Sequence, residues 1–245
     1  MDNPKLYTIE QVEDTLQLKT WWAIWGVLPI ANRIVVLIVN HTKISPNTVS
    51  IIAFCFRIIS GISFLKGDWS FDIAGASFYY FAYTLDCIDG PVARLTEKSS
   101  EFGRYLDHLS DLTGDLFILC CLAFGQGQFF SIIIISMCVM HIFEAYISYL
   151  AGLIVKDRMP DTNSIGNKFW GILKLYQNYR MFFLKKNIKS FISFPDYELF
   201  VFIVFPVIGI PLKGIMIGFF MLVCVVLYSV FSTFWAIYSG DGKFP

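Results

Sequence analysis

The stretch Asp86-Cys-Ile-Asp89-Gly90-Pro-Val-Ala93-Arg94, followed after eight residues by Gly103-Arg-Tyr-Leu-Asp107-His-Leu-Ser-Asp111, sets four carboxylates in or beside strongly apolar sequence. Asp86 and Asp89 are three residues apart, and Asp107 and Asp111 are four apart. On a helix, both spacings put the two side chains on one face, about one turn from each other. We therefore expect two helices joined by a short turn, with the four acids gathered near it.

The composition of the chain places this stretch in a membrane protein. Of the 245 residues, 56% are hydrophobic and only 16% are charged, and the mean hydropathy is +0.61. Soluble domains carry about 25% charged residues. The six cysteines lie in apolar segments and form no CxxC pair, so we expect them to fill space. The sequence predicts an all-α integral membrane protein in contact with the lipid bilayer, and we expect no nucleic-acid partner.

Six apolar segments approach the length of about 20 residues that a membrane-spanning helix needs. The predicted helices cover residues 46–66, 71–93, 104–124, 129–155, 196–212 and 214–239. The helix predicted over residues 46–66 has a clear N-terminal signal, because Ser45 is a capping residue and Pro46 suits a first turn. Residues 46–240 are therefore predicted to form one six-helix membrane domain.

Residues 1–45 are predicted to form a cytoplasmic and interfacial segment ahead of this domain. Within residues 17–44, tryptophan and aliphatic side chains are interrupted by Lys19, Asn32 and Arg33. This mixture favours an amphipathic helix that lies in the membrane interface. A short seventh span is the alternative.

The basic residues predict the orientation of the chain. Sixteen of the nineteen Lys and Arg lie in residues 1–45, 94–104, 156–196 and 240–245. Positive residues gather on the cytoplasmic side, so both termini and the acid-rich turn are predicted to be cytoplasmic. We expect the basic, aromatic loop 156–196 to be an interfacial helix attracted by anionic lipid, with a solvated loop as the alternative. With no long targeting segment, the chain suits a bacterial or archaeal cytoplasmic membrane.

The four aspartates need a counter-charge. An ionised residue costs about 2.5–3.5 kcal/mol at the centre of a bilayer and less near its surface. Arg94 and Arg104 offset only part of the charge. Divalent metal is the simplest answer, because carboxylate oxygens suit Mg²⁺, Mn²⁺ or Ca²⁺, and Mg²⁺ commonly bridges carboxylates to substrate phosphates. Gly90, Ala93 and Gly103 would leave room for a bulky ligand, although each glycine alone equally fits a plain helix break.

The pattern Asp86-x2-Asp89-Gly90-x2-Ala93-Arg94-x8-Gly103-x3-Asp107-x3-Asp111 resembles, position for position, the signature of the class I CDP-alcohol phosphotransferases, also called CDP-alcohol phosphatidyltransferases. The segment Ser45-Pro46-Asn47-Thr48-Val49-Ser50 is similar to the one that opens the family's first helix. The resemblance extends over residues 17–240, although only 45–50 and 86–111 are diagnostic. It implies a membrane enzyme of six helices.

The resemblance also implies a role for each matching residue. Two Mg²⁺ or Mn²⁺ ions, on the diphosphate of a CDP-linked donor, would be held by Asp86, Asp89, Asp107 and Asp111. Asp111 would in addition be the general base that acts on the acceptor hydroxyl. The nucleotide and its phosphates would be bound by Gly90, Ala93, Arg94 and Gly103, with Ser100, Asn47 and Ser50 as weaker candidates.

One departure from the family concerns the acceptor. Many members that use glycerol phosphate have an arginine where this chain has Ala53, and Arg57 follows one turn later. Arg57 either faces the acceptor cavity or pairs with an acid such as Glu144 or Asp115. His141 and Glu144 are three residues apart and either bind the acceptor or form a satisfied polar pair inside the bundle.

We therefore predict an integral membrane phosphotransferase of phospholipid biosynthesis. It would move a substituted phosphate group from CDP-diacylglycerol or another CDP-alcohol to an acceptor hydroxyl and release CMP. The resemblance also implies a homodimer. Two other functions stay open: an intramembrane Mg²⁺-dependent prenyltransferase, which would need its acidic motifs further apart, and a divalent metal transporter, which would carry acids at mid-membrane on several helices. Release of CMP would exclude both.

Overall fold

The computed structural model describes residues 6–16, 20–155 and 193–239, and over these residues it contains helices and no strand. The elements, with η marking π-helices, are α1 (Ile9–Asp14), η1 (Ala23–Val27), α2 (Leu28–His41), α3 (Pro46–Phe64), α4 (Trp69–Leu95), α5 (Glu101–Gly125), α6 (Ile132–Val155), α8 (Phe194–Glu198), η3 (Leu199–Val204), α9 (Phe205–Val207) and α10 (Pro211–Ser239). The all-α prediction is therefore confirmed for the described part of the chain.

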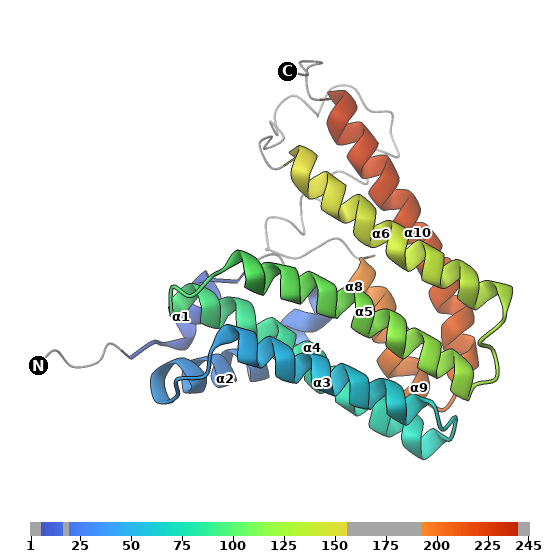
Figure 1. The fold of residues 1–245 in the computed structure, drawn as a ribbon, viewed down its shortest axis with the longest axis horizontal. Helices are drawn as coiled ribbons and strands as arrows, with labels where there is room; N and C mark the ends of the chain where they lie inside the picture. The colour runs from blue at the N-terminus through green and yellow to red at the C-terminus, as the bar shows by residue number, and fades with distance from the viewer. Residues whose placement is uncertain (1–5, 17–19, 156–192, 240–245) are drawn as a thin grey trace, which may run out of the picture.

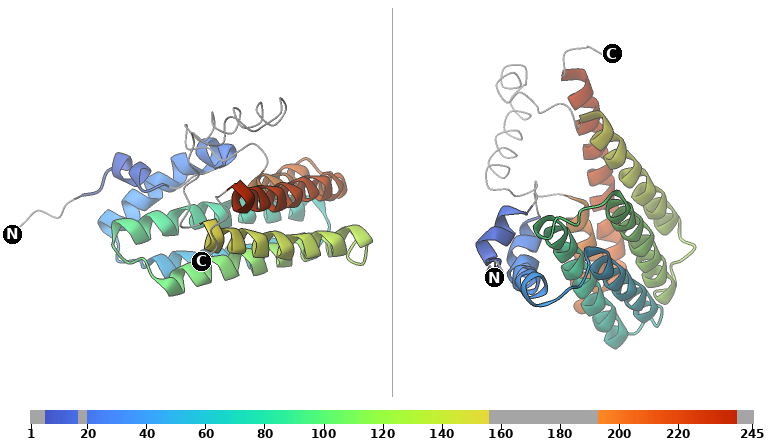
Figure 2. Two further views of the ribbon diagram at one scale, coloured as in Figure 1. Left: turned by 90° about the horizontal axis from the view of Figure 1, so that it is seen from above. Right: turned by 60° about the vertical axis from the view of Figure 1, so that its left-hand side comes forward.

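The helix α3 packs along both α4 and α5, whereas α4 and α5 approach each other much less closely. Figure 1 shows these three helices side by side, with α6 and α10 running together away from them. The two further views in Figure 2 show the same division. The helix α3 therefore sets how far apart α4 and α5, which carry the acidic motif, are held.

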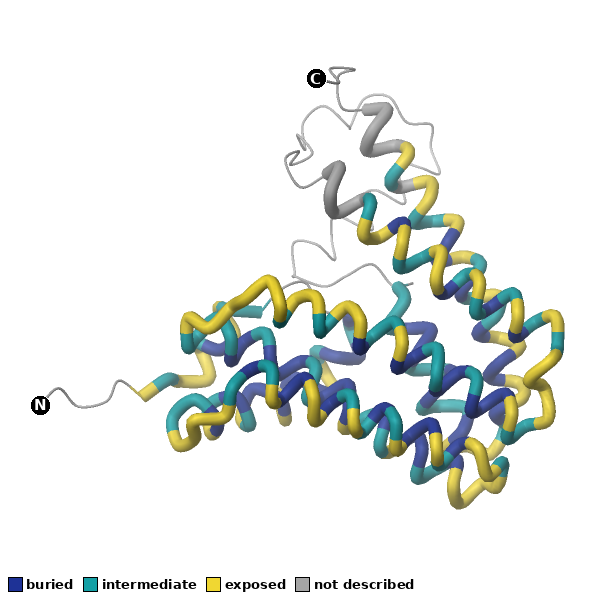
Figure 3. The backbone as a smooth tube through the Cα atoms, viewed as in Figure 1, coloured by how far each residue is buried: buried dark blue, intermediate teal, exposed yellow. Residues whose placement is uncertain are grey.

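One apolar core joins α3, α4, α5 and α6 to η3 and α10. Its members include Tyr79, Leu119, Phe202 and Leu222, each with no exposed surface. Buried positions gather where the helices meet, and the outward faces are exposed (Figure 3). Many of the exposed side chains are large and apolar, which is the surface expected of a protein surrounded by lipid.

Within residues 6–16, 20–155 and 193–239, five helical segments are long and apolar enough to cross a membrane. They are Ala23–His41, Pro46–Phe64, Glu101–Gly125, Ile132–Leu150 and Pro211–Phe231. The protein is therefore an integral membrane protein. Two of the six predicted spans, 71–93 and 196–212, are not in this set. The helix α4 has 27 residues, but its acids and tyrosines lower its hydropathy, and residues 194–207 are divided among three short elements.

The predicted helix boundaries agree with the structure to within a few residues, apart from 196–212. At the start of α3, the Thr48 amide donates to Ser45 Oγ over 3.2 Å, as the predicted cap requires. Ser100 caps α5 in the same way, through the Gly103 amide at 3.0 Å. The predicted interfacial loop 156–196 lies outside the described residues, except for its last four.

The N-terminal segment contains two helical runs, α1 and η1–α2, and the second packs against α4. Its position in the membrane interface stays a prediction. The two ends of the segment meet at the C-terminal end of α4: the Tyr7 amide donates to Asn40 Oδ1 over 2.8 Å, and the Tyr7 hydroxyl donates to the Leu95 carbonyl over 2.9 Å. In η1, the Gly26 carbonyl accepts a hydrogen bond from the Tyr80 hydroxyl. The two contacts on α4, at Tyr80 and at Leu95, are separated by fifteen residues and therefore by about 22 Å along that helix.

The second of these runs, η1–α2, packs in this way because a stripe of small and branched residues lies along it. Ala23, Val27, Ala31 and Val35, each four residues after the last, have no exposed surface. Such a stripe lets α2 approach α4 closely. The opposite face carries exposed apolar residues, which explains why the same segment also has the composition of a span.

The turn between α3 and α4 rests directly on the end of α5. A Cβ atom added to Gly67 would lie 2.2 Å from the Gly125 carbonyl oxygen, and Gly67 has a φ of +69°. A Cβ added to Gly125 would lie 2.1 Å from the Phe64 carbonyl oxygen. Both glycines are therefore required by backbone contact.

We expect Gly67→Ala to destabilise the protein more than Gly127→Ala. Gly127 has a φ of +68° but no atom near its added Cβ, so it isolates the backbone penalty of about 1–2 kcal/mol. The clash at Gly67 should add about 1–3 kcal/mol. Denaturation of both variants in detergent measures the difference, and equal losses would show that the contact with Gly125 is unimportant.

Candidate functional site

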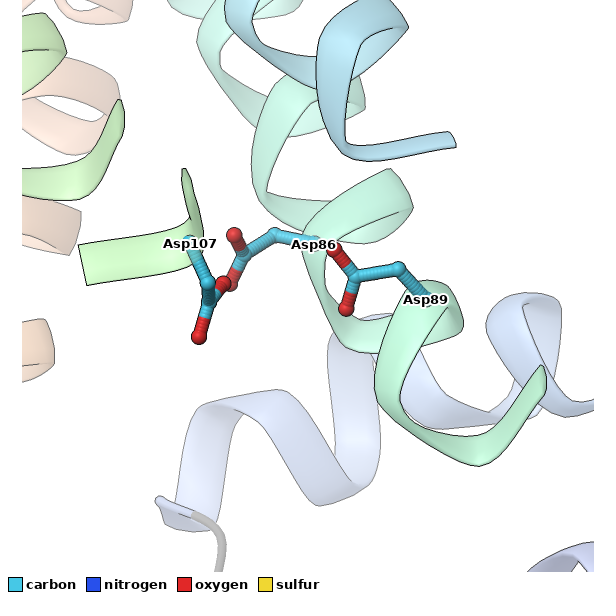
Figure 4. A group of neighbouring side chains, drawn as sticks. All are labelled: Asp86, Asp89 and Asp107. Atoms are coloured by element: carbon cyan, nitrogen blue, oxygen red, sulfur yellow. The ribbon is translucent and has the colours of Figure 1, made fainter. Parts of the chain in front are cut away.

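Three of the predicted metal ligands lie together between α4 and α5. Asp86 and Asp89 of α4 and Asp107 of α5 each offer a carboxylate oxygen, and these oxygens lie within 4.8 Å of one another. Figure 4 shows the three side chains converging from the two helices. Asp89 is buried, while Asp86 and Asp107 are half-buried. The i, i+3 spacing on α4 and the capped start of α5 bring the acids to the same end of the bundle.

Asp111, the fourth predicted ligand, lies one turn further along α5 and is held by Arg57. Its Oδ1 is 2.6 Å from Arg57 Nη2. It is not one of the three acids whose oxygens lie within 4.8 Å of one another. The structure therefore brings the four acids to one region but turns one oxygen of Asp111 toward a cation.

Arg57 is the buried cation of this site. Its guanidinium lies 3.6 Å from Asp86 Oδ1 and 3.3 Å from Asp115 Oδ1, in addition to its contact with Asp111, and its side chain is 3% exposed. Of the alternatives that the sequence left open, pairing with Asp115 is confirmed. Glu144 has different partners, the hydroxyls of Ser148 and Ser229.

Of the two other arginines near the motif, Arg94 lies beside it and Arg104 lies at the surface. Arg94 lies over Gly90, because a Cβ added to Gly90 would be 3.0 Å from Arg94 Nη2. Arg104 is exposed and pairs with Glu101 at 3.6 Å. The expectation that Arg104 offsets the charge of the aspartates is therefore wrong, because its side chain points to the helix surface. The arginine that contacts Asp86 and Asp111 is Arg57, from α3.

The start of α3 supplies two polar residues to the site. The Ser50 hydroxyl donates to Asp89 Oδ2 over 2.5 Å. Asn47 faces Gly103, where an added Cβ would lie 3.0 Å from Asn47 Oδ1 and 3.1 Å from Ser100 Oγ. Ser50, Asn47 and Ser100 therefore surround the acidic motif from outside it, and Ala93 is half-buried on the last turns of α4.

His141 and Glu144 do not form the satisfied polar pair that we considered. His141 is 1% exposed and packs against the Phe194 ring, with ring centroids 4.5 Å apart. Neither of its ring nitrogens has a hydrogen-bond partner among the described residues. This pair lies in α6, outside the group of aspartates.

The donor set at the acid cluster fits a hard divalent cation. Three carboxylates whose oxygens lie within 4.8 Å of one another repel strongly unless a cation lies among them. Oxygen-only ligands suit Mg²⁺ and Mn²⁺. A cluster of this kind at the end of apolar helices is able to hold the phosphates of a substrate through such ions.

Comparison with curated proteins finds archaeal relatives. The chain is 35% identical over 94 residues to the bifunctional IPC transferase and DIPP synthase of Archaeoglobus fulgidus, covering 38% of this chain and 18% of that protein. It is also 35% identical over 82 residues to the archaetidylinositol phosphate synthase of Pyrococcus horikoshii, covering 34% of this chain and 42% of that protein. The match thus spans less than half the length of either relative.

Comparison with solved structures finds a similar fold. Mycobacterium tuberculosis phosphatidylinositol phosphate synthase with CDP-DAG bound superimposes with a TM-score of 0.51 over 87% of this chain and 96% of that chain, at 17% identity. The same enzyme in complex with manganese and citrate gives a TM-score of 0.50 over 87% of this chain and 90% of that chain, at 16% identity. At such identity the likeness is one of fold.

The sequence profile of the CDP-alcohol phosphatidyltransferases matches residues 43–235, which include α3, α4, α5 and their acids. The match covers most of the chain and contains the whole acidic motif. The protein therefore belongs to the CDP-alcohol phosphatidyltransferase family.

Proposed function

We propose that this protein transfers a substituted phosphate group from a CDP-linked donor to an acceptor hydroxyl and releases CMP, in the synthesis of phospholipids. The observation that carries the proposal is the meeting of Asp86, Asp89 and Asp107 within 4.8 Å at one end of an apolar bundle. Membership of the family supports the reaction, and the CDP-DAG bound to the mycobacterial enzyme supports a CDP-linked donor.

Asp86, Asp89, Asp107 and Asp111 would hold two Mg²⁺ or Mn²⁺ ions. Such a pair stabilises both the attacking and the leaving oxygen of an in-line displacement. The manganese in the mycobacterial structure and the donor set of the cluster support this choice. The helix α3 packs against both helices that carry the acids and so fixes the distance between them. At this fixed distance the acids would orient the donor.

Asp111 would act as the general base. It would take the proton of the acceptor hydroxyl while that oxygen bonds to the distal phosphorus of the donor. The bond from this phosphorus to the CMP oxygen would break at the same time, so CMP leaves with the electron pair. A carboxylate beside cations is a modest base, and the reaction therefore depends on positioning as well as on proton transfer.

The nucleotide and phosphates would lie beside the small residues of the motif. Gly90, Ala93 and Gly103 keep the helix surfaces free of large side chains, and the Arg94 guanidinium over Gly90 is suitably placed for a phosphate. Asn47, Ser50 and Ser100 would complete the site from the starts of α3 and α5.

The topology we propose has six spans within residues 46–240, with both termini and the site on the cytoplasmic side of a bacterial or archaeal membrane. The contact between Tyr7 and Leu95 supports an N-terminus on the same side as the end of α4. Residues 7–41 would then enter and leave the bundle on one side. A homodimer is part of the proposal from the family resemblance.

The first prediction from the proposed function concerns the reaction itself. Purified protein with Mn²⁺ or Mg²⁺ should release CMP from CDP-diacylglycerol or a CDP-alcohol when given the right acceptor, such as inositol phosphate, glycerol phosphate or serine. Asp111→Asn should lower turnover by about 10²–10⁴-fold, the usual contribution of a general base. Absence of CMP with every pair, in folded protein that carries metal ions across liposome membranes, would favour a transporter instead.

A second prediction concerns the hydrogen bond from Ser50 to Asp89. Ser50→Ala should reduce metal affinity or activity by about 10-fold, because a group that orients a metal ligand is lost. Ser63→Ala is the matched control: Ser63 lies on the same helix, is half-buried, and its hydroxyl donates to the Ile59 carbonyl, away from the acids. Equal activity of both variants, measured over a range of Mn²⁺ concentrations, would contradict a role for Ser50.

A third prediction tests the side of each loop. In a variant free of the six native cysteines, Thr8→Cys and Lys98→Cys should react with an impermeant thiol reagent from one side of sealed vesicles, and Gln128→Cys from the other. All three positions are exposed. Labelling of Thr8→Cys from the opposite side to Lys98→Cys would show that residues 23–41 cross the membrane.

A further inference from the structure

We propose that Arg57 and Asp115 together position the reactive centre and set its charge. In this view Arg57 orients Asp111 and Asp86 from α3, and Asp115 neutralises Arg57 so that the four motif acids keep their full negative charge for cations. Arg57 and Asp115 lie outside the motif. The inference rests on the proposed function for the meaning of turnover, but its central measurement is metal binding.

The contacts of Arg57 form a fork that joins three helices. Nη2 contacts Asp111 Oδ1 at 2.6 Å, and Nη1 lies 3.6 Å from Asp86 Oδ1. Nη1 also donates to Ser110 Oγ over 3.2 Å. A planar guanidinium keeps such contacts in fixed relative directions, which a lysine ammonium does not. Arg57 is therefore able to hold one carboxylate from α4 and one from α5 in register.

The helix α5 leaves room for the Arg57 side chain at Gly114. A Cβ added to Gly114 would lie 2.6 Å from Arg57 Cδ, so any larger residue at this position of α5 would displace the arginine. Gly114 is buried. The path of Arg57 from α3 to the acids thus depends on a missing side chain next to Asp115.

Asp115 offsets part of the positive charge that Arg57 brings close to the metal ligands. A guanidinium between two cation ligands would repel the cations and cancel part of the charge that attracts them. Asp115 Oδ1 lies 3.3 Å from Arg57 Nε, on the side of the guanidinium away from the terminal nitrogens, and both side chains are 3% exposed. Burial leaves little water to screen the pair. Glu198 of α8 is also buried and shares a hydrogen bond with Asp115, so Asp115 contacts Arg57 as one of two acids outside the motif.

Asp111 is able to satisfy both Arg57 and the proposed chemistry. An ionised carboxylate has two oxygens that accept contacts. Oδ1 faces Arg57, and the Asp111 carboxylate also lies within hydrogen-bonding reach of Asp86, so Asp111 joins Arg57 to the acid cluster. Arg57 acts through Asp111 and is a positioning residue.

This charge relation predicts opposite effects for two substitutions. Arg57→Gln removes a positive charge beside the cluster and should tighten Mn²⁺ binding by about 3–10-fold, whereas Asp115→Asn removes the acid that contacts Arg57 Nε and should weaken it by a similar factor, because both effects follow from one charge acting on a nearby cation. The double variant should bind Mn²⁺ within about 2-fold of the original protein if the two effects cancel. Loss of the fork should lower turnover of Arg57→Gln by about 10-fold or more at saturating Mn²⁺.

The experiment titrates the full-length protein in detergent with Mn²⁺ alone and follows free Mn²⁺ by electron paramagnetic resonance. Asp72→Asn is the matched control, because Asp72 is equally buried but lies on the first turn of α4, about 21 Å along that helix from Asp86. It should leave Mn²⁺ affinity unchanged. Arg57→Lys keeps the charge and loses the fork, so it should preserve Mn²⁺ affinity and lower turnover.

Weaker Mn²⁺ binding in both single variants would overturn the proposal and reduce the pair to a structural support. If the single variants do not fold, the charge-balanced double variant decides: normal Mn²⁺ affinity with low turnover supports the proposal, and lost affinity contradicts it. Failure of the unsubstituted protein to release CMP would instead count against the proposed reaction, while opposite shifts in Mn²⁺ affinity would still support the charge relation.

Discussion

Mutual repulsion of acids at the end of an apolar helix bundle is the constraint on which this structure depends. Asp86, Asp89 and Asp107 meet within 4.8 Å, and Asp111 and Asp115 continue the acidic face of α5. Such a group is stable next to a membrane only with positive charge among it. Among the residues that the structure describes, the buried cation at this group is Arg57, and the remaining negative charge is what makes the site able to bind metal ions.

The helix α3 positions most of the residues of this site. It packs along both acid-bearing helices, while α4 and α5 make little direct contact with each other. From its first turns it brings Asn47 and Ser50 to the motif, and from its middle it brings Arg57. Gly67 and Gly125 allow the far ends to touch backbone to backbone. The distance across the site is thus set by packing elsewhere on α3.

The N-terminal segment shows how residues with the composition of a span can also pack along another helix. Residues 23–41 are apolar on both faces, because one face packs on α4 and the other is exposed at the surface of a membrane protein. Hydropathy alone does not distinguish these two apolar environments. The hydrogen bonds from Tyr7 to Asn40 and Leu95 join residues far apart in the chain.

The sequence by itself determined the helical class, five helix positions to within a few residues, and the motif of four aspartates, because periodicity, caps and spacing act locally along the chain. It also predicted that Ser50 and Asn47 lie near the motif, through the family resemblance. Only the tertiary structure decided that Arg57, and not Arg104, contacts Asp86 and Asp111, and that the N-terminal segment packs back along α4. These outcomes depend on which helices pack together and on the room left at Gly114, and contacts between distant segments have no signature in local spacing.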